Sequence, residues 1–204
     1  MALWKDRILP YFVHAALKAP EFRELRWQYL GGAEGEVLEI GFGSGLNVPH
    51  LSSRVRKLYA VEPAEAAWRI ARAAIERAYF PVERTGRTAE AIPLPDGSVD
   101  EAISSFSLCT IPDVERALGE VRRVLRPGGI FRFVEHGRSD DPRISRWQDR
   151  LDPVQRFLAG GCHLNREPDR LLREAGFRIE RLDRFEVPGP RVIMSLYGGT
   201  ATPA

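Results

Sequence analysis

One short apolar run leads directly into three closely spaced glycines, and this junction limits the possible folds more than any other feature. Residues 37–40 have the composition of a buried strand, and Gly41, Gly43 and Gly45 follow at once. We expect a helix to begin near Gly45. A strand, a glycine turn and a helix in this order are typical of open α/β sheets, which bind ligands where their strands end. The junction therefore predicts a parallel sheet with a binding site at the glycine turn.

The rest of the chain repeats the alternation of short apolar runs with longer segments of helical spacing. The runs predict strands at residues 37–40, 58–62, 82–85, 99–105, 130–135, 177–182 and 192–197. Asp113 is placed to cap the helix that follows the fourth of these strands. The predicted fold class is therefore α/β: a doubly wound, mostly parallel sheet of seven strands with helices on both faces.

The length and composition fit one folded domain. The chain has 204 residues, of which 44% are hydrophobic and 28% charged, and no repeat or flexible linker divides it. Within the single domain, we expect residues 1–36 to form a helical cap over the binding site and residues 37–204 to form the ligand-binding domain. Residues 137–165 interrupt the alternation, and we interpret them as an insertion on the substrate side.

The charge balance and the cysteines exclude several classes of protein. The 30 basic and 28 acidic residues leave a net charge of +2, so no nucleic-acid partner is expected. Cys109 and Cys162 are too few for a disulfide framework, and their spacing matches no zinc motif. We therefore expect no metal site and a reducing, cytoplasmic location. The longest apolar stretch, residues 8–17, is too short to span a membrane, so no transmembrane segment is expected; peripheral membrane contact and the oligomeric state stay open.

The glycine spacing narrows the choice of ligand. A dinucleotide fingerprint would need glycine where the chain has Leu46, and the ending of a nucleoside triphosphate loop is absent. Glu62 ends the second predicted strand beside the glycine turn, where a carboxylate accepts the ribose hydroxyls of an adenosine. Two alternatives remain at this point: a tight turn that binds nothing, and a Glu62 side chain that is only solvated. The pattern as a whole favours an adenosine-containing ligand.

Four segments in their order along the chain resemble class I S-adenosylmethionine-dependent methyltransferases. Residues 37–45 look like the first motif of that family, and residues 61–63 like its ribose-binding motif. Residues 88–100 resemble the adenine-binding segment, and residues 120–129 the signature before the fifth strand. The resemblance implies a Rossmann-like sheet with an antiparallel last strand. It also implies S-adenosylmethionine as the methyl donor and S-adenosylhomocysteine as the product.

Three shorter segments resemble a narrower branch of the family. Residues 107–111, 135–136 and 160–166 look like the thiol methyltransferase-like branch, whose animal members methylate alkyl thiols and hydrogen sulfide. Some bacterial proteins that resemble this branch are called phospholipid methyltransferases. The resemblance therefore implies that the methyl acceptor is a small molecule, and a thiol is the first candidate. The alternative is a phospholipid, or another molecule that is methylated on nitrogen or oxygen.

The resemblance also implies which residues hold the donor. Glu39 is expected to face its amino group, Glu62 the ribose, and the backbone at Ala89 the adenine. Many relatives have aspartate where this chain has Thr88. The full set of expected donor-binding residues is Glu39, Gly41, Phe42, Gly43, Gly45, Asn47, Glu62, Pro63, Thr88, Ala89, Glu90, Ser104, Ser105 and Phe106.

A thiol acceptor would need help with its proton, because the thiolate is the reactive form and a free thiol has a pKa of about 8.5. His136 and His163 are the candidate proton acceptors, and Glu135 is a candidate to orient either imidazole. The alternatives are a histidine that only supports its loop and a glutamate paired with arginine. Cys109 and Cys162 are more often small buried residues than nucleophiles.

Two hypotheses from other functional classes remain on the sequence alone. The first is an NAD(P)-dependent oxidoreductase, since dehydrogenases share the strand, glycine turn and helix; Leu46 counts against it. The second is a protein that binds the donor without catalysis. Methyl transfer by in-line displacement mainly requires alignment of the two reactants and exclusion of water, without a metal or a covalent intermediate.

Overall fold

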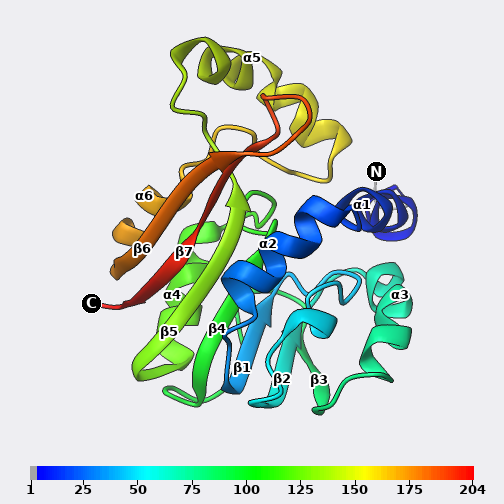
Figure 1. Cartoon of the computed structure of the whole chain (residues 1–204), viewed down its shortest axis with the longest axis vertical. Coiled ribbons are helices and arrows are strands. Elements are labelled where there is room, and N and C mark those ends of the chain that lie inside the picture. Colours follow the sequence, from blue (N-terminus) through cyan, green and yellow to red (C-terminus); the bar gives the residue numbers. More distant parts are fainter. Residues whose placement is uncertain (1–3) are drawn as a thin grey trace.

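Seven strands form one sheet in the order β3-β2-β1-β4-β5-β7-β6, in a computed structural model that describes residues 4–204 (Figure 1). The strands are β1 (Gly35–Ile40), β2 (Val55–Val61), β3 (Val82–Gly86), β4 (Val99–Ser105), β5 (Leu125–His136), β6 (Phe177–Glu186) and β7 (Ser195–Pro203). Neighbours from β3 to β5 run parallel, whereas β7 is antiparallel to both β5 and β6. The predicted seven-stranded sheet with an antiparallel last strand is confirmed.

Helices cover both faces of the sheet, as predicted. The helical elements are η1 (Trp4–Ile8), α1 (Leu9–Leu17), α2 (Pro20–Leu30), η2 (Val48–His50), α3 (Glu65–Ile75), α4 (Val114–Val124), α5 (Pro142–Leu158) and α6 (Pro168–Glu174). One apolar core joins the sheet to α4 and α6, and the other joins it to α2 and α3. Asp113 caps α4, since its carboxylate accepts a hydrogen bond from the Arg116 backbone N–H at 3.0 Å.

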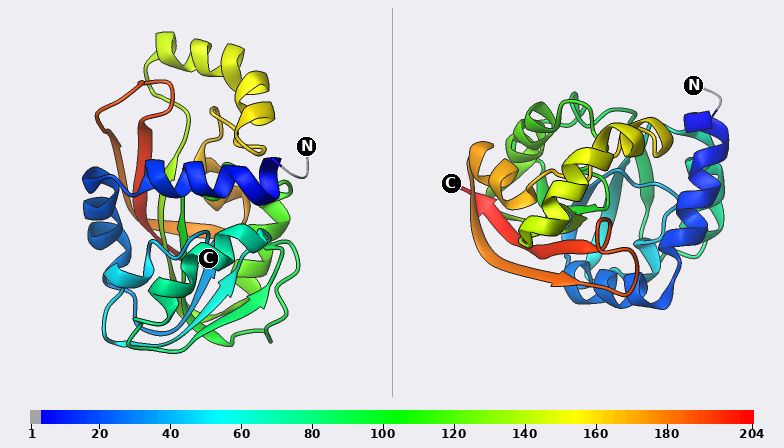
Figure 2. Two further views of the ribbon diagram at one scale, coloured as in Figure 1. Left: turned by 90° about the vertical axis from the view of Figure 1, so that its right-hand side faces the viewer. Right: turned by 90° about the horizontal axis from the view of Figure 1, so that it is seen from above.

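The strand order reverses between β1 and β4, and this reversal positions the site. The chain leaves β1 toward β2 on one side, while β4 pairs with the other side of β1. Ligands of open α/β sheets bind at such a switch point, outside the carboxyl ends of the strands. Figures 1 and 2 show α5 beyond the arrowhead of β5, and α1 at the same end of the sheet.

Several predicted limits differ from the structure: β2 and β5 start earlier than expected, and β6 ends later. Two further differences have a local cause. No helix begins near Gly45: the chain forms turns and then only the short 3₁₀ helix η2, because Pro49 lacks an N–H and β2 already starts at Val55. The last strand starts at Ser195 rather than at residue 192. Residues 190–194 form a turn instead, in which the Met194 N–H donates to the Pro190 carbonyl at 3.1 Å.

The helices α1 and α5 leave large apolar side chains on the surface. Tyr11 and Phe12 are exposed on α1, and Phe157 and Leu158 are exposed on α5. The indole N–H of Trp4 in η1, which directly precedes α1, donates to the Leu158 carbonyl at the end of α5 at 2.9 Å. Among residues 4–204, no helix is both long enough and apolar enough to cross a membrane.

Candidate functional site

The loop after β1 turns through three glycines whose φ angles are all positive. These angles are +69° at Gly41, +58° at Gly43 and +73° at Gly45, and glycine is the residue that adopts such angles without steric strain. A Cβ atom at Gly41 would overlap the hydroxyl oxygen of Ser107, which donates to the Gly41 carbonyl at 3.2 Å. The glycine loop is therefore in direct contact with the segment that follows β4.

Glu62 lies just past β2, and its carboxylate rests on the glycine loop. One oxygen accepts the Gly43 N–H at 2.7 Å, and the other accepts the Ala64 N–H at 2.7 Å. Burial raises the pKa of Glu62, and these two hydrogen bonds oppose that shift. The structure thus brings Glu62 to the loop, where it also fixes the loop's shape. Pro63, between Glu62 and Ala64, is exposed.

Glu39 is fully buried on β1 and is hydrogen-bonded to the segment that follows the glycine loop. Its Oε1 accepts the Asn47 side-chain amide at 2.6 Å, and the same amide donates to the Ser105 hydroxyl at 2.9 Å. Its Oε2 has no hydrogen-bond partner among the described residues. Burial raises the pKa of Glu39 to about 8, although the bond from Asn47 and the charge of Arg26 act in the opposite direction. One buried carboxylate oxygen is therefore available to a cationic ligand.

A buried arginine of α2 also belongs to this region, and the sequence analysis missed it. Arg26 is 2% exposed, and its guanidinium lies 5.8 Å from the centre of the Phe106 ring. Its Nη1 donates to the Leu17 carbonyl at 2.9 Å, while its Nε has no partner among residues 4–204. Arg26 lies four residues after Phe22, on the apolar face of α2. This spacing could have predicted that Arg26 is buried.

Phe106 marks the end of β4 with an unusual backbone. Its φ is +53°, which is uncommon for a residue other than glycine and often marks a functional turn. Its ring meets the Phe22 ring edge to face, with centroids 5.2 Å apart. Phe42 of the glycine loop is also buried, and its ring packs on that of Trp68 with centroids 5.2 Å apart.

The segment predicted to hold the adenine lies between β3 and β4. Ala89 is buried in the core that includes α4. Thr88 and Glu90 are hydrogen-bonded to each other through their side chains, and Glu90 Oε1 accepts the Asp113 N–H at 3.3 Å. The structure therefore directs both polar side chains toward each other and toward the start of α4.

Glu135 is fully buried on β5, and its contacts differ from those expected. Its Oε1 accepts the Ser104 hydroxyl at 2.6 Å, and its Oε2 accepts the N–H groups of Ser107 and Leu108 at 2.8 and 3.2 Å. None of its hydrogen bonds within the described chain goes to a histidine. Burial raises the pKa of Glu135 to about 7. Glu135 holds the turn after β4, and Ser104 faces this carboxylate.

The two candidate histidines occupy different surroundings. His136 is buried, and its Nε2 lies 3.0 Å from the Cys162 sulfur. His163 lies beside a carboxylate instead, with its Nδ1 at 3.6 Å from Asp152 Oδ2. The Cys162 sulfur is 3.6 Å from the Cys109 sulfur, although these residues are 53 positions apart. The sequence spacing did not indicate this grouping of two thiols and an imidazole.

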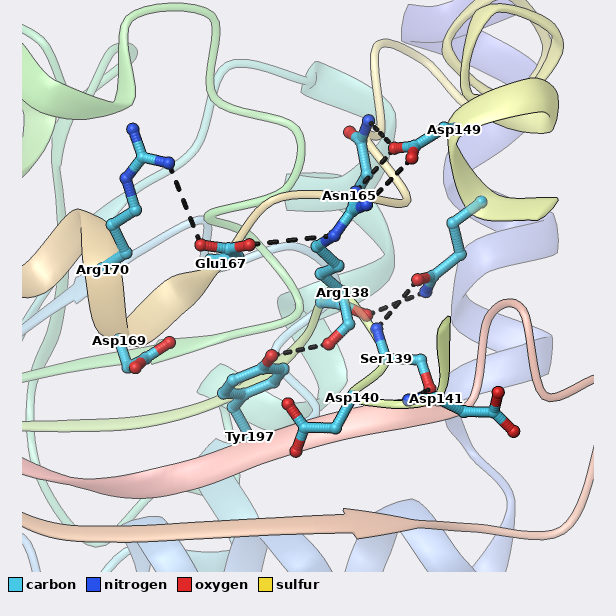
Figure 3. A network of polar contacts seen from close by, with 12 residues as sticks. Arg138, Ser139, Asp140, Asp141, Asp149, Asn165, Glu167, Asp169, Arg170 and Tyr197 are labelled. Carbon is cyan, nitrogen blue, oxygen red and sulfur yellow. Dashed lines mark hydrogen bonds and ion pairs between the residues drawn. The ribbon is translucent and has the colours of Figure 1, made fainter. Parts of the chain in front are cut away.

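A polar network braces the insertion that carries Cys162 (Figure 3). Arg138 donates two hydrogen bonds to Asp149 of α5, at 2.6 and 2.9 Å, and Asn165 donates a third to the same carboxylate at 3.0 Å. Tyr197 of β7 donates its hydroxyl proton to the Arg138 carbonyl. The network ties both ends of the insertion to α5 and to the sheet, and so fixes where Cys162 lies.

The helix α1 reaches the glycine loop. His14 Nδ1 lies 2.8 Å from the Ser44 hydroxyl, which places α1 in contact with the glycine loop. Burial lowers the pKa of His14, with a smaller contribution from the charge of Lys18. Among the expected donor residues, Gly43 and Glu62 are joined by a hydrogen bond, and Asn47 bonds to both Glu39 and Ser105. Ser104 points instead toward Glu135, and Thr88 and Glu90 point toward each other and the start of α4.

In sequence, the chain is similar both to a family model and to individual known proteins. A family model described as a methyltransferase domain matches residues 38–133. The chain is 30% identical over 207 residues to the human thiol S-methyltransferase TMT1A, covering 92% of this chain and 84% of that protein. It is 31% identical over 175 residues to the human thiol S-methyltransferase TMT1B, covering 81% of this chain and 71% of that protein.

The fold is also shared with solved structures. An S-adenosylmethionine-dependent methyltransferase from Thermotoga maritima, described as a possible histamine N-methyltransferase, superposes with a TM-score of 0.68. The two chains are 24% identical, and the superposition covers 97% of this chain and 98% of the other. At this identity the likeness shows only that the fold is shared. The sequence similarity to the thiol S-methyltransferase TMT1A covers 92% of this chain, so it extends beyond the donor-binding segments into the insertion. The chain therefore belongs to the S-adenosylmethionine-dependent methyltransferases, in one family with the thiol S-methyltransferases.

Proposed function

We propose that this methyltransferase transfers the methyl group to a small thiol. The observation that carries the proposal is the identity of 30% with a thiol S-methyltransferase across 84% of that relative. A relative that matched only in the donor-binding half would say little about the acceptor, because the donor is common to all methyltransferases. The match here includes residues 137–165, the insertion that lies at the carboxyl end of the sheet.

The residues around the glycine loop fit an S-adenosylmethionine donor. A Cβ atom at Gly43 would meet no atom closer than 3.8 Å, so the loop is open there, and Glu39 Oε2 is a buried acceptor without a partner among the described residues. When bound, the donor supplies a methyl group on a sulfonium centre. In our proposal Glu39 holds the donor's amino group, Glu62 accepts the ribose hydroxyls, and the backbone of Ala89 contacts the adenine. We also propose that η1, α1 and α2 cover the site and exclude water, which the contact of His14 with Ser44 supports.

The acceptor assignment is tested by a panel read through S-adenosylhomocysteine release. We expect hydrogen sulfide and small alkyl thiols to be methylated, and primary amines, phenols and phosphatidylethanolamine to give at least 10-fold lower kcat/KM. Reaction mixtures without acceptor control for slow hydrolysis of the donor. Faster methylation of an amine or a lipid than of every thiol would reject the thiol assignment and favour the N- or O-methyltransferase alternative.

Peripheral membrane contact and a cytoplasmic location stay predictions from the sequence.

Donor binding is expected to release a proton. In the donor-free protein the pKa of Glu39 is about 8, so most of this carboxyl is protonated at pH 7. An ammonium group beside Oε2 favours the ionised form and lowers that pKa, so the proton leaves on binding. Affinity should therefore rise by up to about tenfold per pH unit as pH approaches 8, and level off above it.

Calorimetry in two buffers of different ionisation enthalpy measures this proton. The binding enthalpy should change between the buffers by an amount that corresponds to nearly one proton at pH 7. Glu39→Gln keeps the shape of the side chain but has no proton to lose, so its binding should be weaker and independent of the buffer. Equal buffer dependence in the two proteins would show that the proton comes from another group.

A further inference from the structure

Two thiols and an imidazole from three separate parts of the chain meet beside the proposed donor site. Cys109 follows β4, His136 ends β5, and Cys162 lies in the insertion. The Cys162 sulfur is 3.0 Å from His136 Nε2 and 3.6 Å from the Cys109 sulfur. The three candidate ligand atoms lie within 4.8 Å of one another, and the three residues are only 2% to 9% exposed. We call these residues the Cys2His cluster.

The spacing of the Cys2His cluster is close to that of a tetrahedral zinc site. Zinc bonds of about 2.3 Å to sulfur and about 2.0 Å to nitrogen place two sulfurs about 3.8 Å apart, and a sulfur and a nitrogen about 3.6 Å apart. The observed separations are 3.6 Å between the sulfurs and 3.0 Å between the Cys162 sulfur and His136 Nε2. The third separation, between the Cys109 sulfur and the His136 nitrogen, is within 4.8 Å. Side-chain shifts of up to about 1 Å would bring all three separations to those of a zinc site. Thiolate and imidazole are also the ligands that zinc prefers.

Each ligand is carried by a braced segment. The Glu135 carboxylate holds the N–H of Leu108, next to Cys109. Arg166 donates to the carbonyls of Leu108 and Ile111, the second at 2.8 Å. The His163 N–H donates to the Cys109 carbonyl at 2.8 Å, which joins the insertion to the segment after β4. The three ligands are therefore positioned by the fold before any metal binds, as metal sites require.

The cluster has only three ligands and adjoins the donor site. No fourth histidine, cysteine or carboxylate of the described residues joins it. Catalytic zinc sites keep three protein ligands and one open position, whereas structural sites use four. The Cys109 sulfur lies 3.7 Å from the Phe106 carbonyl, and Ser107 contacts Gly41 of the glycine loop. We propose that Cys109, His136 and Cys162 form a zinc site whose open position takes the sulfur of the acceptor thiol; this rests on the proposed thiol function.

Such a site would supply the thiolate that the reaction needs. A free thiol with a pKa of about 8.5 is mostly protonated at neutral pH, whereas a thiol that coordinates zinc is deprotonated. On binding, the sulfur–hydrogen bond breaks, the electron pair stays on sulfur and binds the metal, and the proton passes to solvent. The zinc ion keeps its charge throughout. The acceptor is then held as a nucleophile beside the proposed donor site.

The first test measures the metal. The full chain, purified with zinc present and without chelator, should contain about one zinc ion per molecule by elemental analysis. Cys109→Ser and Cys162→Ser should each weaken zinc binding by more than 100-fold, because loss of a ligand exceeds the roughly 10- to 100-fold effect of altering an outer contact. His163→Asn is the matched control and should keep its zinc. Zinc-free wild-type protein, or a disulfide between Cys109 and Cys162 in place of the metal, would overturn the proposal.

The second test uses cobalt(II) in the wild-type protein and needs no variant to fold. Cobalt should give thiolate-to-metal charge-transfer absorption, which zinc displaces and which ethanethiol or hydrogen sulfide changes by entering the open position. Ethanol and dimethyl sulfide, which offer no thiolate, should leave the spectrum unchanged. Absence of the charge-transfer absorption, or a spectrum that thiols do not alter, would refute the open zinc site.

The two proposals can fail separately. Thiol methylation at an undiminished rate by zinc-free protein would remove the metal from the mechanism and leave the proposed function intact. Conversely, a cobalt spectrum that responds to ethanethiol in a protein that methylates only amines or lipids would leave the metal site intact and reject the thiol-methyltransferase function.

Discussion

Replacing Glu62 with alanine is expected to weaken S-adenosylhomocysteine binding by roughly 10- to 150-fold, which corresponds to about 1.5–3 kcal/mol. Hydrogen bonds to an ionised carboxylate are stronger than those between neutral groups, and Glu62 is placed to accept the ribose hydroxyls. The substitution also frees the N–H groups of Gly43 and Ala64, which each donate to this carboxylate at 2.7 Å. Isothermal titration calorimetry measures the change directly.

The conservative variant separates the two contributions of Glu62. Glu62→Gln keeps one side-chain acceptor for a loop N–H and loses the charge, so its affinity should fall between wild type and Glu62→Ala. Chemical denaturation without ligand reports the loop contribution alone. Unchanged affinity in Glu62→Ala would remove this residue from the binding site.

Replacing Gly41 with alanine is expected to destabilise the protein by about 2–5 kcal/mol and to impair donor binding. Its φ of +69° is about 1–2 kcal/mol less favourable for alanine than for glycine. The new methyl group also overlaps the Ser107 hydroxyl, and such overpacking adds about 1–3 kcal/mol. The displaced Ser107 would shift the turn after β4, so donor affinity should fall in the same variant.

Gly128 offers a matched control for the backbone strain. Its φ is +79°, and a Cβ atom there would have no neighbour within 4 Å. Gly128→Ala should therefore show only the strain of about 1–2 kcal/mol and normal donor affinity. Urea denaturation and calorimetry on both variants make the comparison. Equal destabilisation of the two variants would contradict the close approach of Gly41 to Ser107.

The sheet could be predicted because its strands are local patterns in the sequence. Residues 99–105 form a strand with the predicted limits, and Asp113 caps the helix that follows, because apolar runs, turns and caps act over a few residues. The segment after Gly45 could not be predicted in the same way. A glycine turn usually opens a helix, but here Pro49 and the early start of β2 leave space only for η2.

The site was harder to predict than the strands, because more of it is formed by contacts between residues that are distant in the sequence. Glu39, Asn47 and Glu62 could be placed because they lie next to the glycine loop along the chain or in the sheet. The Cys2His cluster could not, because β4 and β5 end side by side and the insertion then folds back to them. Arg26 was missed for a related reason, since burial of a charged side chain depends on what packs over it.

The most direct test of the account is a crystal structure of the chain with S-adenosylhomocysteine. We predict that the nucleoside lies along the loop of Gly41, Gly43 and Gly45, with its ribose hydroxyls on the Glu62 carboxylate and its amino group near Glu39 Oε2. A nucleoside bound elsewhere, or a Glu62 carboxylate that makes no contact with the ribose, would contradict the account.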